Sequence, residues 1–261
     1  MTESKKTKKI GDTYLVPALK RGLQILAMFS GKVRVLTIND FAERLGVSTS
    51  SIYRTVITLT ELNYLKKIER NSYELGSMVL SNGFIYLAAR EIVQVAAPYI
   101  LELRDESSSS CHLAIREGLH AIYVYRAPSP QKLSVNIPIG SRFPCHTVAA
   151  GRSLLTGLKD EQISDLFSGV ALDRSIPPAP TSLPLLRQII AEDRTRGFSL
   201  NHSDSATAIA VPVKNYAGEV VAAVNISAPD TLMGEESVRK SLTTLLIKAA
   251  HRISSELGGL D

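Results

Sequence analysis

The 261-residue chain is 44% hydrophobic and 21% charged, with two cysteines and a formal net charge of +5. A chain of this length and composition can bury a sizeable core and form two domains, which excludes a wholly disordered protein. It has no signal-peptide pattern, no apolar run of about 18 residues and too few cysteines for a disulfide scaffold, so we expect a cytoplasmic protein without a membrane span.

The positive charge is concentrated in the first part of the chain. Residues 1–76 contain 13 lysines and arginines against 7 aspartates and glutamates, whereas residues 77–261 contain 17 against 18. A basic excess confined to one segment is expected for a domain that neutralises phosphates, since a generally basic enzyme would spread it over the chain. Residues 1–13 are polar and lysine-rich, and we predict a disordered tail there.

Three short helices are predicted next. Apolar residues at helical spacing between Pro17 and Phe29 would complete a three-helix core, and they include Leu19, Leu23, Ile25 and Leu26. In the next helix Thr37 and Asp40 occupy capping-box positions and Gly46 ends the pattern. The apolar face of that helix consists of Ile38, Phe41, Ala42 and Leu45.

The third helix is expected to follow Ser48, which can cap it. Its inward stripe is Ile52, Val56, Leu59 and Leu62. Its outer face shows Ser50, Arg54 and Thr58, whereas Glu61, two turns on, would repel phosphate. This asymmetry favours a recognition helix whose N-terminal part meets base edges.

A basic β-hairpin follows this helix. Runs at Tyr64–Ile68 and Tyr73–Leu75 flank a turn at residues 70–72, where Asn71 tolerates positive φ. Together with the helices, this hairpin predicts a winged helix-turn-helix in residues 14–76 that binds double-stranded DNA. The residues expected at DNA are Thr37, Ser48, Thr49, Ser50, Ser51, Tyr53, Arg54, Thr58, Lys66, Lys67 and Arg70.

The remaining chain predicts an α+β domain over residues 90–261, preceded by a linker helix at residues 77–89 that is too apolar to be free. Strand and helix signals alternate, with hairpins between helices at both ends, which favours an antiparallel sheet. Strands are expected at Leu113–Ile115, Ala121–Arg126, Leu133–Ile139, Ala206–Val213 and Glu219–Ser227. Helices are expected at 91–106, Thr147–Leu155, Asp160–Leu166, around Leu185–Ile190 and at Leu242–Leu257.

Several polar residues lie in or beside the apolar strands of this second domain. Convergent donors of this kind can hold a small anionic or polar ligand, although each one alone has an ordinary structural explanation. The candidates are Arg142, His146, His202, Asn225 and Ser227.

Two Cys-His dipeptides, Cys111-His112 and Cys145-His146, offer alternative chemistry. Zinc is disfavoured, because neighbouring residues on a strand point to opposite faces and no CxxC or HxxxH spacing is present. A thiol-dependent hydrolase using Cys145 and His146 stays open as a second function, although no nucleophile-elbow motif supports it. A third possibility is a structural module that uses residues 77–89 for assembly. We expect no metal, no cofactor and no enzymatic activity.

The sequence also resembles the IclR family of transcriptional regulators. The similar blocks occur in the family's order and span about Leu19 to Gly258. They are DFAERLGVSTSSIYRTVITLTELNYL, the hairpin end YELG, GSRFPCHTVAAGRSLL, GFSLN, IAVPVKNYAGEVVAAVNISAP and ISSELG.

This resemblance implies a winged helix-turn-helix, a linker helix and a C-terminal GAF-like effector domain. It also implies homodimers or dimers of dimers on a palindromic operator, and a small-molecule effector, often a carboxylic or aromatic acid. Positions matching the family pocket are Gly151, Asn201, Ala208, Asn225 and Ser227. Two departures, Asn201-His202-Ser203-Asp204 in place of a Glu pair and Ala208 in place of a Cys, imply an effector other than the family's better-known keto acids.

Overall fold

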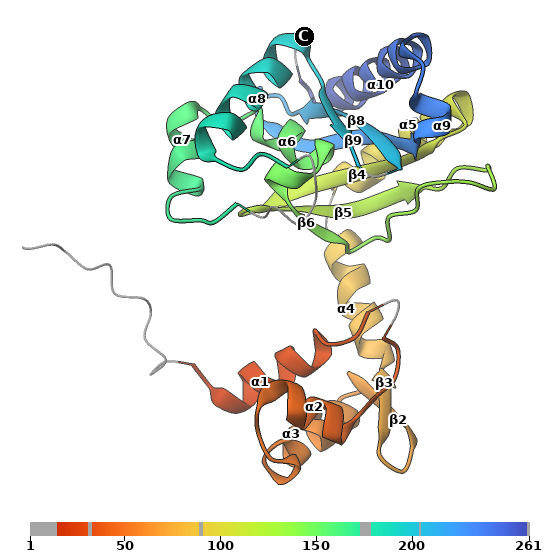
Figure 1. Cartoon of the computed structure of the whole chain (residues 1–261). Helices are drawn as coiled ribbons and strands as arrows, with labels where there is room; N and C mark the ends of the chain where they lie inside the picture. Colours follow the sequence, from red (N-terminus) through yellow and green to blue (C-terminus); the bar gives the residue numbers. More distant parts are fainter. Residues whose placement is uncertain (1–14, 31–32, 89–90, 173–178, 204, 260–261) are drawn as a thin grey trace, which may run out of the picture. The chain divides into compact units, whose positions relative to one another are not determined.

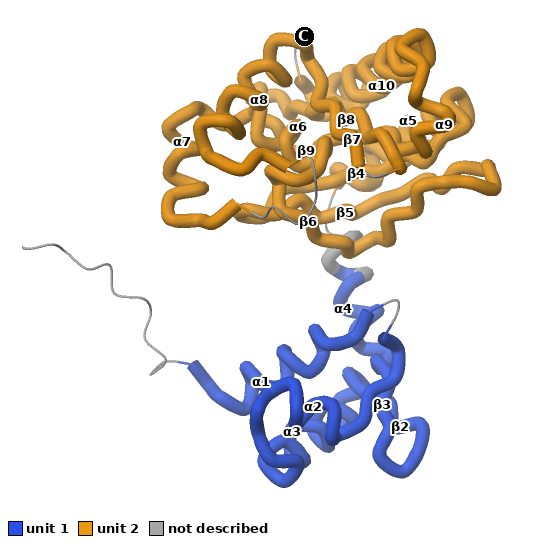
Figure 2. The backbone as a smooth tube through the Cα atoms, viewed as in Figure 1, with its two compact units in different colours: residues 1–87 blue, residues 88–261 orange. Residues whose placement is uncertain are grey.

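The computed structural model describes residues 15–30, 33–88, 91–172, 179–203 and 205–259. The chain divides into two compact units, Met1–Leu87 and Ala88–Asp261, coloured blue and orange in Figure 2. The predicted disordered tail, residues 1–13, lies outside the described residues.

The first unit is a small helical domain with a three-stranded antiparallel sheet in the order β1-β3-β2 (Figure 1). Its elements are α1 (Pro17–Leu26), β1 (Leu36–Thr37), α2 (Ile38–Leu45), α3 (Thr49–Glu61), β2 (Leu65–Glu69), β3 (Ser72–Leu75) and α4 (Ser77–Ala88). The core combines side chains from α1, α2, α3 and the three strands, namely Ile25, Leu36, Phe41, Ala42, Ile52, Val56, Leu65 and Tyr73. The predicted helix-turn-helix and hairpin are therefore confirmed.

Both predicted helix caps are present. The Thr37 hydroxyl accepts from the Asp40 backbone N–H, while the Asp40 carboxylate accepts from the Thr37 backbone and hydroxyl at 2.7 Å, so the capping box is complete. These hydrogen bonds from Thr37 lower the pKa of Asp40. Ser48 caps α3 by accepting from the Ser51 N–H at 3.3 Å. Caps of this type satisfy backbone donors that a helix start leaves open.

Three predicted core positions are wrong. Leu19 and Leu23 of α1 are 62% and 60% exposed, and the buried residues of this helix are Gly22 and Ile25. Leu62 is also exposed, since α3 ends at Glu61 and Asn63 turns the chain with φ 58°. The apolar pattern indicated the helices but not which turn of each reached the core.

The first turn of α4 is tied to the base of the hairpin. The Gly76 N–H donates to the Tyr64 carbonyl at 2.9 Å, and the Met78 N–H donates to the Asn63 carbonyl at 3.1 Å. One turn further on, the Asn82 amide donates to the Tyr64 hydroxyl at 2.6 Å. The beginning of the predicted linker helix therefore belongs structurally to the first unit.

The second unit is built on a six-stranded antiparallel sheet in the order β6-β5-β4-β9-β8-β7. Its strands are β4 (Ser110–Glu117), β5 (His120–Ala127), β6 (Arg142–Pro144), β7 (Ser199–His202), β8 (Ala206–Lys214) and β9 (Val220–Pro229). Its helices are α5 (Glu91–Ser107), the 3-10 turn η2 (Cys145–Thr147), α6 (Ala149–Leu155), α7 (Asp160–Leu166), α8 (Leu183–Arg196), α9 (Asp230–Met233) and α10 (Glu236–Glu256). The predicted antiparallel sheet with helices is confirmed.

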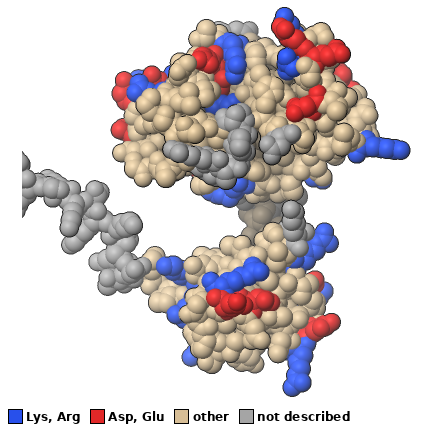
Figure 3. Space-filling view, viewed as in Figure 1, with Lys and Arg blue, Asp and Glu red and all other residues tan. Residues whose placement is uncertain are grey.

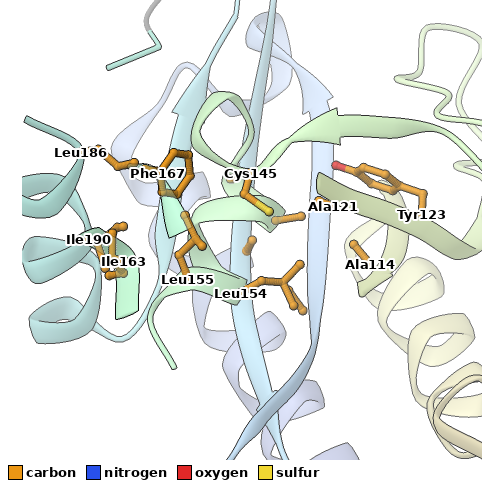
Figure 4. Close-up of a cluster of buried hydrophobic side chains, with 14 residues drawn as sticks. Ala114, Ala121, Tyr123, Cys145, Leu154, Leu155, Ile163, Phe167, Leu186 and Ile190 are labelled. Atoms are coloured by element: carbon orange, nitrogen blue, oxygen red, sulfur yellow. The ribbon is translucent and has the colours of Figure 1, made fainter. Parts of the chain in front are cut away.

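Helices cover both faces of this sheet (Figure 1). α5 and α10 pack against one face, while α6 packs against the other and is flanked by α7 and α8. Figure 4 shows the apolar cluster on the α6 side, where Cys145 lies between Phe167 and Leu155 on one hand and Tyr123 and Ala114 on the other. Small side chains on the strands let α6 approach the sheet closely.

Two details differ from the sequence prediction. Leu133–Ile139 is not a strand, because the chain bends there and only Arg142–Pro144 pairs with β5. The final helix begins at Glu236, two turns before the predicted start at Leu242. The first turn of this helix is polar, so apolar periodicity alone could not reveal it. In the described part of the chain, the helices are all too short or too polar to cross a membrane.

The close approach at Gly76 predicts a large stability difference between two glycines of the first unit. A Cβ at position 76 would lie 2.0 Å from the Asn63 carbonyl oxygen, whereas a Cβ at Gly83 in α4 would meet nothing within 4 Å. Gly76→Ala should therefore destabilise the unit by about 2 kcal/mol or more through backbone displacement. Gly83→Ala, the matched control, should be neutral or stabilise by up to about 1 kcal/mol through helix propensity. Urea unfolding of both variants measures this, and equal stabilities would contradict the close packing of Gly76 on Asn63.

Candidate functional site

The N-terminal half of α3 presents five of the eleven residues predicted to contact DNA, namely Thr49, Ser50, Ser51, Tyr53 and Arg54. Ser50, Tyr53 and Arg54 are exposed, and Ser50 lies 3.0 Å from Ser48 between hydroxyl oxygens. The Thr58 hydroxyl donates to the Arg54 carbonyl at 2.8 Å, which turns it back onto the helix. Thr37 is the least available of the set, because its hydroxyl both donates to and accepts from Asp40.

Basic residues that the sequence analysis missed lie beside the start of α3. The Arg21 guanidinium of α1 donates to the Ser51 hydroxyl at 3.2 Å. Arg21 also lines a hollow of about 390 Å³ with Lys20 and Arg44. The adjacent Lys20-Arg21 pair was the available signal, but only the fold brings α1 next to α3. Guanidinium and ammonium groups clustered beside a recognition helix are suited to phosphate contacts.

The hairpin carries its basic residues on exposed positions. Lys66 forms an ion pair with Glu74 across the two strands at 3.0 Å, so part of its charge is already compensated. Lys67 and Arg70 are exposed and form no ion pair with any described residue. Figure 3 shows basic side chains spread over the first unit with a few acidic ones between them. Lys67 and Arg70 are therefore the wing cations most available to a phosphate backbone.

In the second unit, cross-strand pairing places polar residues in two parallel rows. One row runs Asn201, Ala208, Ser227 and Ser110 across β7, β8, β9 and β4. The other runs Ser199, Ala210, Asn225, His112 and Arg126, and so continues onto β5. Directly paired residues of an antiparallel sheet point to the same face, so all these side chains face the α6 layer.

The centre of these rows is buried and incompletely hydrogen-bonded. Asn225 is 0% and His112 1% exposed. The Asn225 amide donates to the Ser227 hydroxyl at 2.7 Å. Within the described residues, however, the side-chain oxygen of Asn225, Oδ1, and the ring nitrogen Nδ1 of His112 have no hydrogen-bond partner. Buried polar atoms without partners are uncommon in folded proteins, and a bound ligand is one explanation for them.

A buried ion pair holds the end of the first row. The Arg152 guanidinium of α6 donates to the Asn201 side-chain oxygen at 3.0 Å and to the Leu200 carbonyl. Its Nε lies 3.5 Å from the Asp193 carboxylate of α8, which also pairs with Arg196. Burial lowers the pKa of Arg152, and Asp193 opposes this shift. Arg152, which was not among the predicted site residues, therefore holds the Asn201 side chain in place.

Four predicted effector residues do not join the rows, and two of these, Arg142 and His202, lie on strands. Arg142 lies on β6, is exposed and pairs with Glu117 at 2.6 Å. His202 is on the opposite face from Asn201, where its Nδ1 lies 2.8 Å from the Thr207 hydroxyl, which donates in turn to Asp230. For His202 the reason is strand alternation, because adjacent residues of β7 cannot share a face.

His146 and Gly151 have structural surroundings in the helical layer. The His146 ring packs edge-on against Phe167, with centroids 6.0 Å apart. A Cβ at Gly151 would lie 2.4 Å from the Cys145 carbonyl oxygen, so glycine allows α6 to pass close to η2. A packing role accounts for this glycine without a ligand.

His112, Ser110, Ser199 and Arg126 are members of the rows that the sequence analysis did not select. The Arg126 guanidinium donates to the Asn136 side-chain oxygen in the loop before β6, and the His112 ring lies edge-on to Tyr123 at 5.5 Å. Alternation along β4 was a usable signal, since Ser110 and His112 are two residues apart. It could not show which strand β4 would pair with.

The cysteines are poorly suited to covalent catalysis. Cys111 and Cys145 are both free and buried, and burial raises the pKa of each thiol to about 12. A thiol with such a pKa is a weak nucleophile at neutral pH, because the thiolate is the reactive form. Among the residues described, no three His, Cys, Asp or Glu side chains are grouped to hold a metal ion.

Comparisons with known proteins agree with this architecture. Residues 18–69 match the family model "IclR helix-turn-helix domain", and residues 84–255 match "Bacterial transcriptional regulator IclR C-terminal". The chain is 27% identical to the HTH-type transcriptional repressor AllR of Klebsiella pneumoniae over 92% of its own length and 90% of that protein.

Solved structures show the same fold. A transcriptional regulator from Rhodococcus sp. RHA1 matches with a TM-score of 0.81 at 28% identity, covering 93% of this chain and 98% of that one. An IclR homologue from Microbacterium hydrocarbonoxydans, complexed with 4-hydroxybenzoate, matches with a TM-score of 0.77 at 22% identity, covering 92% and 98%. These relatives are regulators rather than enzymes. The C-terminal match alone covers most of the chain, so this protein is a DNA-binding transcriptional regulator that belongs to the IclR family.

Proposed function

We propose that this regulator binds a small organic acid over the two polar rows of its second unit, and that binding changes its affinity for operator DNA. The observation that carries the proposal is the pair of buried, unpartnered atoms at the centre of the rows, the Asn225 carbonyl oxygen and His112 Nδ1, as judged within the described residues. A ligand that hydrogen-bonds to both atoms would remove the free-energy cost of leaving them unsatisfied.

The charges along the rows favour an anionic ligand. Arg126 lies at the end of the row that contains Asn225 and His112, and its guanidinium donates to the neutral side chain of Asn136 rather than to a carboxylate. Arg152 is less available, because it is held by Asp193 and Asn201. A carboxylate near Arg126 therefore fits the site better than a cationic ligand does.

Aromatic neighbours favour a ring in the ligand. Tyr123 lies edge-on to both His112 and Phe143, with ring centroids 5.5 and 5.8 Å apart. Rings in such surroundings gain from edge-to-face contacts with further rings. The structural relative complexed with 4-hydroxybenzoate supports the same class. Aromatic carboxylic acids are thus the ligands to test first.

On the DNA side, we propose that Ser50 and Arg54 read bases while Arg21, Lys67 and Arg70 contact phosphates. A homodimer, or a dimer of dimers, would place two such units on a palindromic operator. Exposed apolar side chains on α1 and α4 support self-association, namely Leu19, Leu23, Leu80 and Ile85. An effector would act by binding more tightly to one arrangement of the heads than to another.

Replacing Arg54 tests the proposed recognition helix. Binding sites selected from a random DNA pool with the wild-type chain supply the operator. Arg54→Ala should lose about 1–3 kcal/mol of binding free energy and relax selectivity at one base position. Lys67→Ala, the matched control, should weaken binding to all DNA sequences alike and make the affinity less dependent on salt concentration. A uniform loss in Arg54→Ala would assign Arg54 to phosphate instead.

Replacing Asn225 tests the effector site. Asn225→Leu removes the unpartnered carbonyl at similar volume, so the fold should persist while ligand binding is lost. The probes are benzoate and 4-hydroxybenzoate, and the readout is the shift in melting temperature that a native-state ligand produces. His202→Ala, on the opposite face of the sheet, should respond like wild type. A wild-type chain that responds to neither acid would contradict the proposed ligand class.

The protonation state of His112 gives a pH prediction. Burial, with a smaller contribution from Arg126, lowers the pKa of His112 to about 4. As pH falls from 6.5 towards 4, His112 binds a proton in the unfolded chain but stays neutral in the folded chain. The free energy of unfolding should therefore fall by up to about 3 kcal/mol. His112→Gln should show a flatter pH profile in urea unfolding. Identical profiles would show that His112 titrates normally in the folded protein.

A further inference from the structure

A cavity lies in the C-terminal unit, where α8 ends and the chain enters β7. It has a volume of about 490 Å³. Its walls come from the C-terminal end of α6, from α8, from the ends of β8 and β9, and from the last turns of α10. Apart from Ser199, which lies at the end of one polar row, no row residue lines it.

A buried hydroxyl at this cavity has no partner. Ser199 is 0% exposed, and its Oγ forms no hydrogen bond with any residue that the structure describes. The adjacent edge of β8 is largely satisfied, since the Lys214 N–H donates to the Ser254 hydroxyl at 3.0 Å and Pro212 has no N–H to offer. Ser199 is therefore a donor or acceptor that a bound molecule could use.

The charge left at the cavity is positive. Arg194 is already engaged with the Asp160 carboxylate at 2.8 Å, the Thr156 carbonyl at 3.0 Å and the Leu158 carbonyl. The Asp193 carboxylate is paired with Arg152 and Arg196. Lys214, by contrast, lines the cavity and has no ion-pair partner in the described ranges. An anion would compensate this ammonium, whereas a cation would meet no free carboxylate.

The remaining walls are apolar, because Phe198, Val211, Pro212 and Val220 also line the cavity. A cavity of this size and mixed lining is within the range of small-molecule sites. We propose that it is a second binding site, separate from the proposed effector site, for a small organic acid whose carboxylate meets Lys214, whose apolar body contacts Val211 and Val220, and whose far end lies towards Ser199.

The experiment is a titration of the full-length chain with 4-fluorobenzoate, followed by fluorine NMR. The wild type should bind this probe with a Kd below about 1 mM at a site that survives Asn225→Leu. Lys214→Glu should weaken that site at least tenfold. Lys240→Glu, which makes the same charge change on the exposed start of α10, should leave it unchanged. Lys214 is exposed, so its replacement should not impair folding.

A second variant separates binding from structure. Ser199→Ala removes the unpartnered hydroxyl without changing the packing volume much, so it should lower the affinity several-fold while the melting temperature stays equal or rises. The proposal is overturned if no probe binds in the millimolar range, or if Lys214→Glu and Lys240→Glu bind alike. It is also overturned if Asn225→Leu abolishes all binding, since the probe would then occupy the effector site alone.

Discussion

The antiparallel pairing of β4 with β9 is the constraint on which the C-terminal unit depends. It places His112 opposite Asn225 and Ser110 opposite Ser227, and it aligns the intervening apolar residues on the other face. This one register sets both faces of the sheet. One face is the apolar surface against which α5 and α10 pack, and the other, beneath α6, carries the two polar rows and is called the polar floor below. The apolar packing surface and the polar rows are held by the same hydrogen bonds between β4 and β9. The polar residues therefore cannot move independently of the core.

The buried polar residues of this unit differ in how completely they are satisfied. Arg152 and Asp193 are both almost fully buried, and their charges are compensated by each other and by Arg196, with Asn201 accepting a further hydrogen bond from Arg152. The facing atoms Arg152 Nε and Asp193 Oδ2 are 3.5 Å apart and form no hydrogen bond with any described residue. Such an ion pair adds little net stability over an apolar pair, but losing one partner is costly, so it mainly fixes geometry. Asn225 Oδ1 and His112 Nδ1 have neither a charged partner nor a hydrogen bond among the described residues. The ion pair therefore holds one end of the rows in place, while the polar atoms at the centre are less constrained by hydrogen bonds.

Local patterns in the sequence were sufficient to predict the helices and the hairpin of the first unit. Capping residues such as Thr37 and Ser48 and the turn around Asn71 act over a few positions, so their consequences can be deduced without a fold. Leu19 and Leu62 were misplaced because their burial depends on which helix turns meet in space. Residues 133–139 were predicted as a strand but are irregular. This error also depends on the tertiary structure, since a strand requires a partner strand at the right distance.

The candidate site was harder to predict, because it is made by pairing between distant strands. Asn225 and Ser227 were selected as polar residues of one apolar strand, but His112 is 113 positions away from Asn225 and was considered only beside Cys111. Arg142 and His202 were selected for their chemistry, and only the register shows that they lie elsewhere. The family resemblance supplied Asn201 and Ala208, which composition and spacing could not.

The alternation along β9 also has a consequence for folding. A slip of one residue against β4 would turn Asn225 and Ser227 towards α5 and α10 and bring Val224 and Ile226 to the α6 side. That misaligned sheet would bury two polar side chains in an apolar layer, at a cost of about 1–3 kcal/mol for each. The polar floor therefore protects the chain from mispairing during folding. Evolving a purely apolar floor for a new ligand would also remove this safeguard against aggregation-prone sheet registers.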